Sequence, residues 1–223
     1  LEALSNEDLI GAAELLLPSE RRSMTEPSFQ IVEELQRLEI LDAELDLHNL
    51  QGVDFDFADV ELEVETISAE LSLVRLLGGQ ASTAINPQSL PLGRLVLDHI
   101  DPADLGSATR EVEQIQPSDA GIAVLKVDDR WYVSILYSVA EALRRDAGAP
   151  IPDPAEALRP RGATSPEAAV DSLLRAALDL DARGVLELLP PDEAAAIHDY
   201  APLFRPELEA AAARTIGERG VQL

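Results

Sequence analysis

The stretch "VDFDFADVELEVE", residues 53–65, decides the fold class, because its apolar residues recur at every second position. Successive side chains on a β-strand point to opposite faces of the sheet, so this period predicts a strand with one apolar and one acidic face. The apolar positions are odd up to Phe57 and even from Val60 onward. The alternation therefore changes phase near Ala58, where we expect a bulge or a turn.

Further strands are expected on both sides of this stretch. Alternation at residues 45–48 predicts one of them, and another is expected at 70–77, where it ends at a Gly-Gly pair. Residues 80–119 hold four prolines, and we expect irregular structure there around one strand at 94–100. "GIAVLKV" and "WYVSILY" then flank a short polar turn, which predicts a hairpin followed by a short helix at 139–145.

The residues before this region have a helical rather than a β pattern. Ser5 and Asp8 are spaced as a capping box, which predicts a short helix that ends at Leu17 and Pro18. Apolar residues at helical spacing predict another helix at 29–41. Helices that precede a contiguous run of antiparallel strands are typical of the α+β class, with the helices packed on a curved sheet.

The decapeptide "GAAELLLPSE" at residues 11–20 returns as "GVLELLPPDE" at 184–193, with six identical positions. At the same offset of 173, Leu1, Ala3 and Asp8 also recur. Glycine and proline punctuate local structure, so their repetition indicates a duplicated module rather than shared composition. Ser165 and Pro166 predict the start of the first helix of the second copy, and a final helix is expected at 206–216.

Five prolines between residues 148 and 166 predict a semi-rigid linker. We therefore expect an α+β domain at 1–148 that lacks the start of its first helix, a linker at 149–163, and the helical start of a second, incomplete copy at 164–223. Half-modules expose unpaired edges, so a homo-oligomer or a swapped dimer stays open.

Composition excludes several classes of partner. The formal net charge is −25, and Lys126 is the only lysine, so nucleic acid and anionic membranes would be repelled. A basic protein partner or a divalent cation stays open. No apolar run is long enough to span a bilayer, and the absence of cysteine excludes disulfides and thiolate metal sites.

The segment "SPEAAVDSLLRAALDLDARGVLELLPPDE", residues 165–193, resembles the opening helices of the nuclear-transport-factor-2-like superfamily, whose fold is a cystatin-type α+β cone. "VDDRWYVS", residues 127–134, is similar to the closing hairpin of that superfamily. The whole chain looks like tandem cone domains of bacterial envelope proteins. That resemblance implies an extracytoplasmic domain with a membrane anchor upstream; the alternative is a cytoplasmic protein.

Many proteins of the cone superfamily are enzymes with Asp, His or Tyr at the mouth of the cone, so the resemblance makes these residue types the catalytic candidates. His48 is expected to face solvent, Asp98 and His99 to point to opposite faces of a strand, and His198 to lie in the incomplete copy. The acids of residues 54–65 lack the glycine that a calcium loop needs. No catalytic, cofactor-binding or metal-binding residue is therefore assigned.

If a pocket exists, the aromatic residues are its expected walls: Phe55, Phe57, Trp131 and Tyr137. Trp131 and Tyr137 are expected on one stripe of the last strand, where core packing is the competing interpretation. The leading hypothesis is a non-catalytic extracytoplasmic domain that binds a protein partner or positions a neighbouring module, without a cofactor. The alternatives are a small-molecule-binding or isomerase-like cone enzyme and an acidic mimic that captures a basic protein.

Overall fold

The computed structural model describes residues 1–105, 111–114 and 121–220. The chain divides into two compact units, Leu1–Ile135 and Leu136–Leu223. It is an α+β protein, with an antiparallel sheet in the first unit and only helices in the described part of the second. The division falls before the proline-rich segment at 149–163, so the helix that precedes that segment groups with the second unit.

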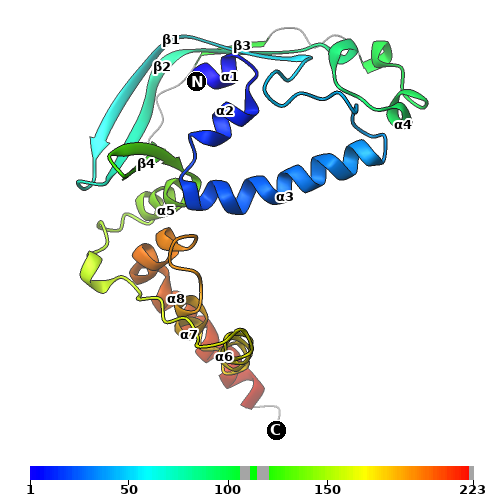
Figure 1. Ribbon diagram of the computed structural model, residues 1–223. Coiled ribbons are helices and arrows are strands. Elements are labelled where there is room, and N and C mark those ends of the chain that lie inside the picture. Colours follow the sequence, from blue (N-terminus) through cyan, green and yellow to red (C-terminus); the bar gives the residue numbers. More distant parts are fainter. Residues whose placement is uncertain (106–110, 115–120, 221–223) are drawn as a thin grey trace. The chain divides into compact units, whose positions relative to one another are not determined.

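The sheet of the first unit has five strands, with the order β1-β2-β4-β5 and with β3 paired to β2. All of the neighbouring strands are antiparallel. Their bounds are β1 Val53–Thr66, β2 Leu71–Ile85, β3 Glu111–Gln114, β4 Gly121–Val127 and β5 Arg130–Ser134. Figure 1 shows that the long β1–β2 ribbon curls into an arc. The curved antiparallel sheet expected from the sequence is therefore present.

The predicted change of phase in the first strand is confirmed. The β1–β2 register shifts between Ala58 and Glu61, and Asp59 takes a positive φ of 51°. A bulge of this kind adds a residue without ending the ladder, so β1 continues to Thr66. Strand β2 also continues through Gly78 and Gly79, contrary to the expected end there. A Cβ on Gly79 would lie 2.9 Å from Val60 Cα, so this glycine lets the two backbones meet at the bulge.

Other strand predictions were wrong. Residues 94–97 form the short helix α4 (Arg94–Leu97), and residues 45–48 are irregular backbone and a turn rather than a strand. The hairpin is confirmed, with positive φ at Asp128 and Asp129 in its turn. However, β5 ends at Ser134 and the helix α5 (Ile135–Asp146) begins at the next residue. Parts of the expected irregular region at 80–119 lie outside the described residues.

Three helices open the first unit: α1 Glu2–Ser5, α2 Leu9–Glu14 and α3 Pro18–Arg37. The capping residue of α2 is Asp8, whose Oδ1 accepts a 2.7 Å hydrogen bond from the Gly11 amide, rather than Ser5. Helix α3 begins earlier than the expected helix at 29–41, because Pro18 takes its first position. Just before it, the Leu17 amide donates to the Val133 carbonyl at 2.7 Å, which ties the helices to strand β5.

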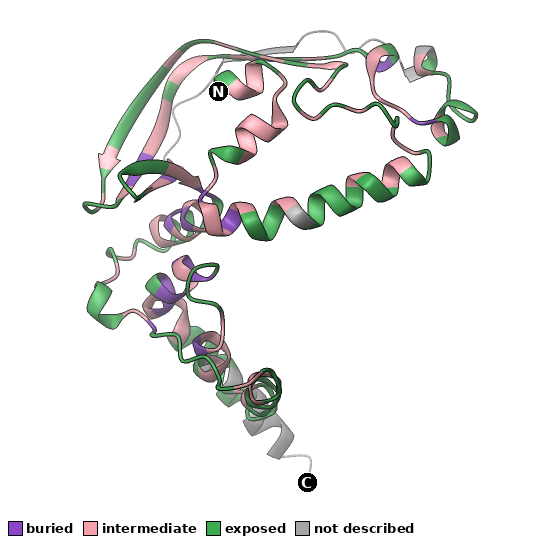
Figure 2. Ribbon diagram, viewed as in Figure 1, coloured by how far each residue is buried: buried purple, intermediate pink, exposed green. Residues whose placement is uncertain are grey.

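The core of the first unit lies against one face of this sheet. Leu73, Ala123 and Ser134 are adjacent in the register and have no exposed surface. Ser134 Oγ and the Ile135 amide both donate to the carboxylate of Glu20, which is itself buried. Figure 2 shows buried positions at the start of α3 and on the strands beside it, whereas much of the rest of α3 is exposed.

The described helices of the second unit are α5, α6 Pro166–Leu178, α7 Ala182–Glu187 and α8 Ala195–Gly220. Ser165 caps α6 as predicted, with Pro166 at its first position. Helix α8 is longer than the expected helix at 206–216 and contains Pro202 and Pro206. Single 3₁₀ turns complete the chain: η1 Pro87–Ser89, η2 Pro102–Leu105 and η3 Pro154–Glu156.

The sequence repeat is also a repeat of local structure. Helices α2 and α7 have bounds that differ by the same offset of 173, as do the ends of α1 and α6. The positive φ of 53° at Glu7 is matched by 54° at Leu180. Asp181 caps α7 through a 2.9 Å hydrogen bond from the Gly184 amide, as Asp8 caps α2. The repeated Asp and Gly therefore specify one helix–turn–helix geometry, used in both units.

The glycine of this motif has a steric reason, which gives a testable expectation. A Cβ on Gly184 would lie 2.5 Å from Asp181 Oδ2, so alanine there must displace the capping carboxylate. We expect Asp181→Ala to lower the free energy of unfolding by about 1 kcal/mol. In a Gly184→Ala background the same substitution should cost much less, because the cap is already displaced. Urea unfolding of the four variants measures this coupling, and additive costs would contradict it.

Candidate functional site

The candidate site is a cleft of about 420 Å³ in the second unit, formed by α5 and α8. Its walls are mainly apolar and include Leu136, Val139, Leu143, Ile197, Leu203 and Phe204. Four alanines, at 140, 147, 149 and 196, leave room between the larger side chains. A volume of this size lies in the range of ligand-binding clefts, about 300–1,000 Å³.

The pattern of α5 explains why one of its faces lines the cleft. Residues 136, 139, 140, 143 and 147 follow spacings of three and four, which place them on one side of a helix. The polar residues Glu141, Arg144 and Arg145 fall between them. The helix thus presents apolar side chains to the cleft and supplies an ionic cluster beside it.

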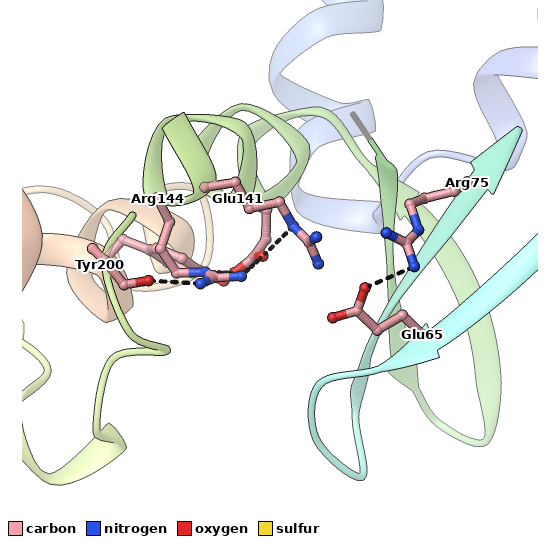
Figure 3. Close-up of polar contacts among 7 residues, drawn as sticks. Glu65, Arg75, Glu141, Arg144 and Tyr200 are labelled. Atoms are coloured by element: carbon pink, nitrogen blue, oxygen red, sulfur yellow. Dashed lines mark hydrogen bonds and ion pairs between the residues drawn. The ribbon is translucent and has the colours of Figure 1, made fainter. Parts of the chain in front are cut away.

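Glu141 is the centre of this ionic cluster and is only 1% exposed. Arg144 donates two hydrogen bonds to its carboxylate, from Nε at 2.9 Å and from Nη2 at 2.8 Å. The Tyr200 hydroxyl donates to Glu141 Oε1 at 2.5 Å, and Arg145 Nε lies 3.6 Å from Oε2. Figure 3 shows Arg144 and Tyr200 converging on Glu141. We call these four residues the Glu141 cluster.

The electrostatics of the Glu141 cluster fix its protonation states. Burial by itself raises the pKa of Glu141, but the hydrogen bonds from Arg144 and Tyr200 and the nearby arginine charges outweigh it and lower that pKa. Burial, together with the Glu141 carboxylate, raises the pKa of Tyr200. At neutral pH the glutamate is therefore ionised and the tyrosine neutral, and the hydrogen bonds between them and Arg144 form a fixed ionic frame.

Further bonds hold the two helices around the cleft. The Tyr137 hydroxyl donates to Asp199 Oδ2 at 2.5 Å, and its ring meets the Tyr200 ring edge to face, with centroids 5.9 Å apart. Arg144 Nη1 also donates to the Ala149 carbonyl at 2.7 Å, which ties down the residues that follow α5. These contacts link α5 to α8 beside the cleft and fix the residues that follow α5.

The structure places the expected aromatic walls on different elements. Phe55 lines a shallow hollow at the start of β1, while Phe57 is half-buried further along that strand. Trp131 lies on β5 and is 48% exposed. Tyr137 was wrongly placed on the stripe of Trp131, because β5 ends before it; it lies buried in α5, in the second unit.

The three histidines lie far apart in the chain and in separate settings. His48 is exposed, as expected, with its Nδ1 3.1 Å from Asp8 Oδ1. His99 follows α4 rather than lying on a strand, and its Nδ1 is 2.9 Å from the Leu95 carbonyl. His198 is 3% exposed, and its Nε2 lies 2.9 Å from the Leu186 carbonyl oxygen.

The described part of the chain was compared with the requirements of a metal site and of a membrane span. Within it, no group of three His, Asp or Glu side chains is arranged to hold a metal ion. No described helix combines the length and the apolar character needed to cross a membrane. The acidic stretch at 54–65 is continuous strand in β1, which is incompatible with the geometry of a calcium-binding loop.

Sequence reasoning missed the Glu141 cluster, although a signal for it was present. The run Glu141, Arg144 and Arg145 places two cations one helical turn after an acid, which is the spacing of helix ion pairs. Such spacing usually indicates an exposed pair, so it does not show that this pair is buried. Tyr200 lies 59 residues away from Glu141, and only the packing of α8 against α5 brings the two together.

Comparison with family models, with curated proteins and with solved structures found no match to this chain. The resemblance to nuclear-transport-factor-2-like proteins therefore stays an expectation from the sequence.

Proposed function

We propose that this chain is a non-catalytic binding domain of a bacterial envelope protein, and that the α5–α8 cleft receives an apolar segment of a partner protein. The cone relationship and the extracytoplasmic setting rest on the resemblance of residues 127–134 and 165–193 to nuclear-transport-factor-2-like proteins. The second copy of the module rests on the repeated motif and the proline-rich linker. The binding role rests on one observation, which is the open apolar cleft beside a fixed ionic frame.

The exposed apolar side chains of the cleft support a binding role. Val139 is 52% exposed and Leu143 is 65% exposed, and both belong to its walls. Apolar area left in water is unfavourable by about 25 cal/mol per Å², so a partner that covers it gains binding free energy. The alanines between these residues leave spaces into which side chains of a partner can insert.

The charge of the rim favours a basic partner segment. Asp146 and Glu207 line the cleft and are exposed, while the cationic groups of Arg144 are bonded to Glu141 and Ala149. The chain as a whole carries a formal charge of −25. The expected occupant is an amphipathic helix that places its apolar side chains in the cleft and Lys or Arg beside the two acids.

The state of the buried acid favours binding over catalysis. A general base must accept a proton near its operating pH, whereas Glu141 has a lowered pKa and both of its oxygens receive hydrogen bonds. Tyr200 has a raised pKa and its hydroxyl is committed to Glu141. The hydrogen bond from Tyr200 to Glu141 links α8 to α5, which supports a structural role for these groups.

A charge placed in the cleft tests this proposal. We expect Val139→Glu to weaken binding of a leucine-containing helical peptide with flanking lysines by at least about tenfold, because the carboxylate would be desolvated by the apolar peptide face. Fluorescence anisotropy of a labelled peptide measures the dissociation constant. Val170→Glu is the matched control, since Val170 is 58% exposed on α6 and does not line the cleft.

Three results would overturn this proposal. A peptide with flanking glutamates that binds as tightly as the lysine peptide would remove the role of Asp146 and Glu207. An uncharged apolar dye that binds in the cleft while no peptide does would replace a protein partner by a small molecule. Equal loss of binding in Val139→Glu and Val170→Glu would show that the peptide binds elsewhere.

A further inference from the structure

The first unit has an apolar surface of its own, on one face of the sheet. The register places Val64, Val74 and Ile122 in one row across β1, β2 and β4. Leu62 lies two residues before Val64 on β1 and therefore on the same face. On β5, Val133 and Trp131 also lie on this face, because they pair with Val124 and Lys126 of β4. We call this surface the apolar sheet face, defined by Leu62, Val64, Val74, Ile122, Trp131 and Val133.

This face is open, in contrast to the opposite face of the same strands. Val64 is 63% exposed, Leu62 54%, Trp131 48% and Ile122 46%. On the opposite face, Leu73, Ala123 and Ser134 are fully buried. Monomeric proteins rarely leave a contiguous apolar surface spread over several strands in water, so this face is suited to an intermolecular contact.

The acidic side chains of β1 beyond its bulge lie on the opposite face of the sheet. Glu61, Glu63 and Glu65 alternate with Leu62 and Val64 and therefore point to the opposite face. There, Arg75 Nη2 lies 2.8 Å from Glu63 Oε2 and 3.4 Å from Glu65 Oε2. Figure 3 shows the contact between Arg75 and Glu65.

On the apolar sheet face, the described strand segments 60–66, 71–77, 121–127 and 130–134 contribute no carboxylate. Lys126 is the charge that they place there, and Asp129 pairs with it at 2.8 Å. Glu70 lies just outside β2, beside Lys126, at the rim. The centre of this face is therefore free of the negative charge that the chain carries elsewhere.

We propose that the apolar sheet face binds the same face of a second copy of this chain, as a two-fold symmetric dimer. Two molecules of formal charge −25 repel each other across acidic surfaces, and the strands of this face bring no acids together. A basic partner would find no carboxylate at its centre, unlike at the rim of the α5–α8 cleft. Two identical sheet faces can pack with interdigitated side chains about 10 Å apart.

Trp131 provides a built-in reporter, because it is the only tryptophan of the chain and belongs to this face. Sedimentation velocity of the full chain over a dilution series is expected to show a monomer–dimer equilibrium. The fluorescence emission of Trp131 should shift to longer wavelength on dilution, because dissociation exposes this side chain to water. High salt should preserve or strengthen the dimer, because salt screens the repulsion between the acidic surfaces.

We expect Val64→Glu to weaken the dimer by at least about tenfold, because it buries a carboxylate against its symmetry mate. The matched control is Val127→Glu, since Val127 is 37% exposed at the end of β4 and pairs with Arg130, on the opposite face. Far-UV circular dichroism checks that both variants fold. If Val64→Glu does not fold, a second variant, Ile122→Glu, is used for the same test.

Three outcomes would overturn the proposal. The first is a monomer at all concentrations with unchanged Trp131 emission. The second is a dimer that Val64→Glu and Val127→Glu weaken equally, which would place the contact elsewhere. The third is a dimer that dissociates in high salt, which would indicate a charge-driven contact. None of these results bears on peptide binding in the α5–α8 cleft.

Discussion

Replacing Glu141 by alanine is expected to lower the free energy of unfolding by about 3–5 kcal/mol, the cost of removing one partner from a buried ion pair. The substitution leaves the guanidinium of Arg144, whose side chain is only 11% exposed, without its carboxylate. It also removes the acceptor of the Tyr200 hydroxyl, which is buried. Urea unfolding followed by far-UV circular dichroism measures the loss.

An exposed ion pair of the same spacing provides the control for Glu141. Glu34 and Arg37 are bonded three residues apart on α3, as are Glu141 and Arg144 on α5, but both side chains are more than half exposed. Glu34→Ala should leave the unfolding midpoint almost unchanged, because water replaces the lost contact. Comparable losses in the two variants would show that the contacts of Glu141 contribute no more than a surface pair.

The pH dependence of stability gives a second readout for the same residue. The pKa of Glu141 is lower in the folded chain than its ordinary value of 4.5. Its ionised form therefore stabilises the fold fully above pH 4.5, and this contribution is lost as the pH falls through the lowered folded pKa. Glu141→Gln should have a shallower loss of stability below pH 4.5 than the parent chain, and an unchanged acid slope would contradict this role.

Leu73→Ala is expected to have the largest effect in the first unit, with a loss of about 2–5 kcal/mol. Leu73 has no exposed surface and lies near the start of β2, where it is paired with Glu65 of β1 and Ala123 of β4. Its neighbours in the sheet are fixed by backbone hydrogen bonds, so they cannot close the cavity that alanine would leave. Thermal or urea unfolding of the purified variant measures the change.

Leu95→Ala is the control for Leu73, because Leu95 is 48% exposed on the short helix α4. The same atoms are removed, but about half of the Leu95 side chain is already in contact with water, so less buried apolar surface is lost. We therefore expect at most about 0.5 kcal/mol of change. A loss for Leu73→Ala no greater than that for Leu95→Ala would mean that the centre of this sheet is not the core of the first unit.

Local sequence patterns predicted those parts of the fold that depend on neighbouring residues. Alternation predicted strand β1 and its bulge, and Ser165 with Pro166 marked the start of α6, because strand periodicity and helix capping act within a few residues. The repeated Asp and Gly likewise gave the same turn twice, at Asp8 and Asp181. Patterns failed at 94–100, where short apolar runs fit a helix and a strand equally well.

The candidate site and the surfaces available to partners were decided only by tertiary structure. The sequence shows that Glu141 has cations one turn away, but burial of that pair depends on Tyr200, which α8 brings from 59 residues further along the chain. It shows that Leu62 and Val64 alternate with acids, but whether that apolar face is covered depends on where the helices pack. Periodicity defines the faces of each element through local geometry, whereas burial and pKa are set by contacts between elements distant in sequence.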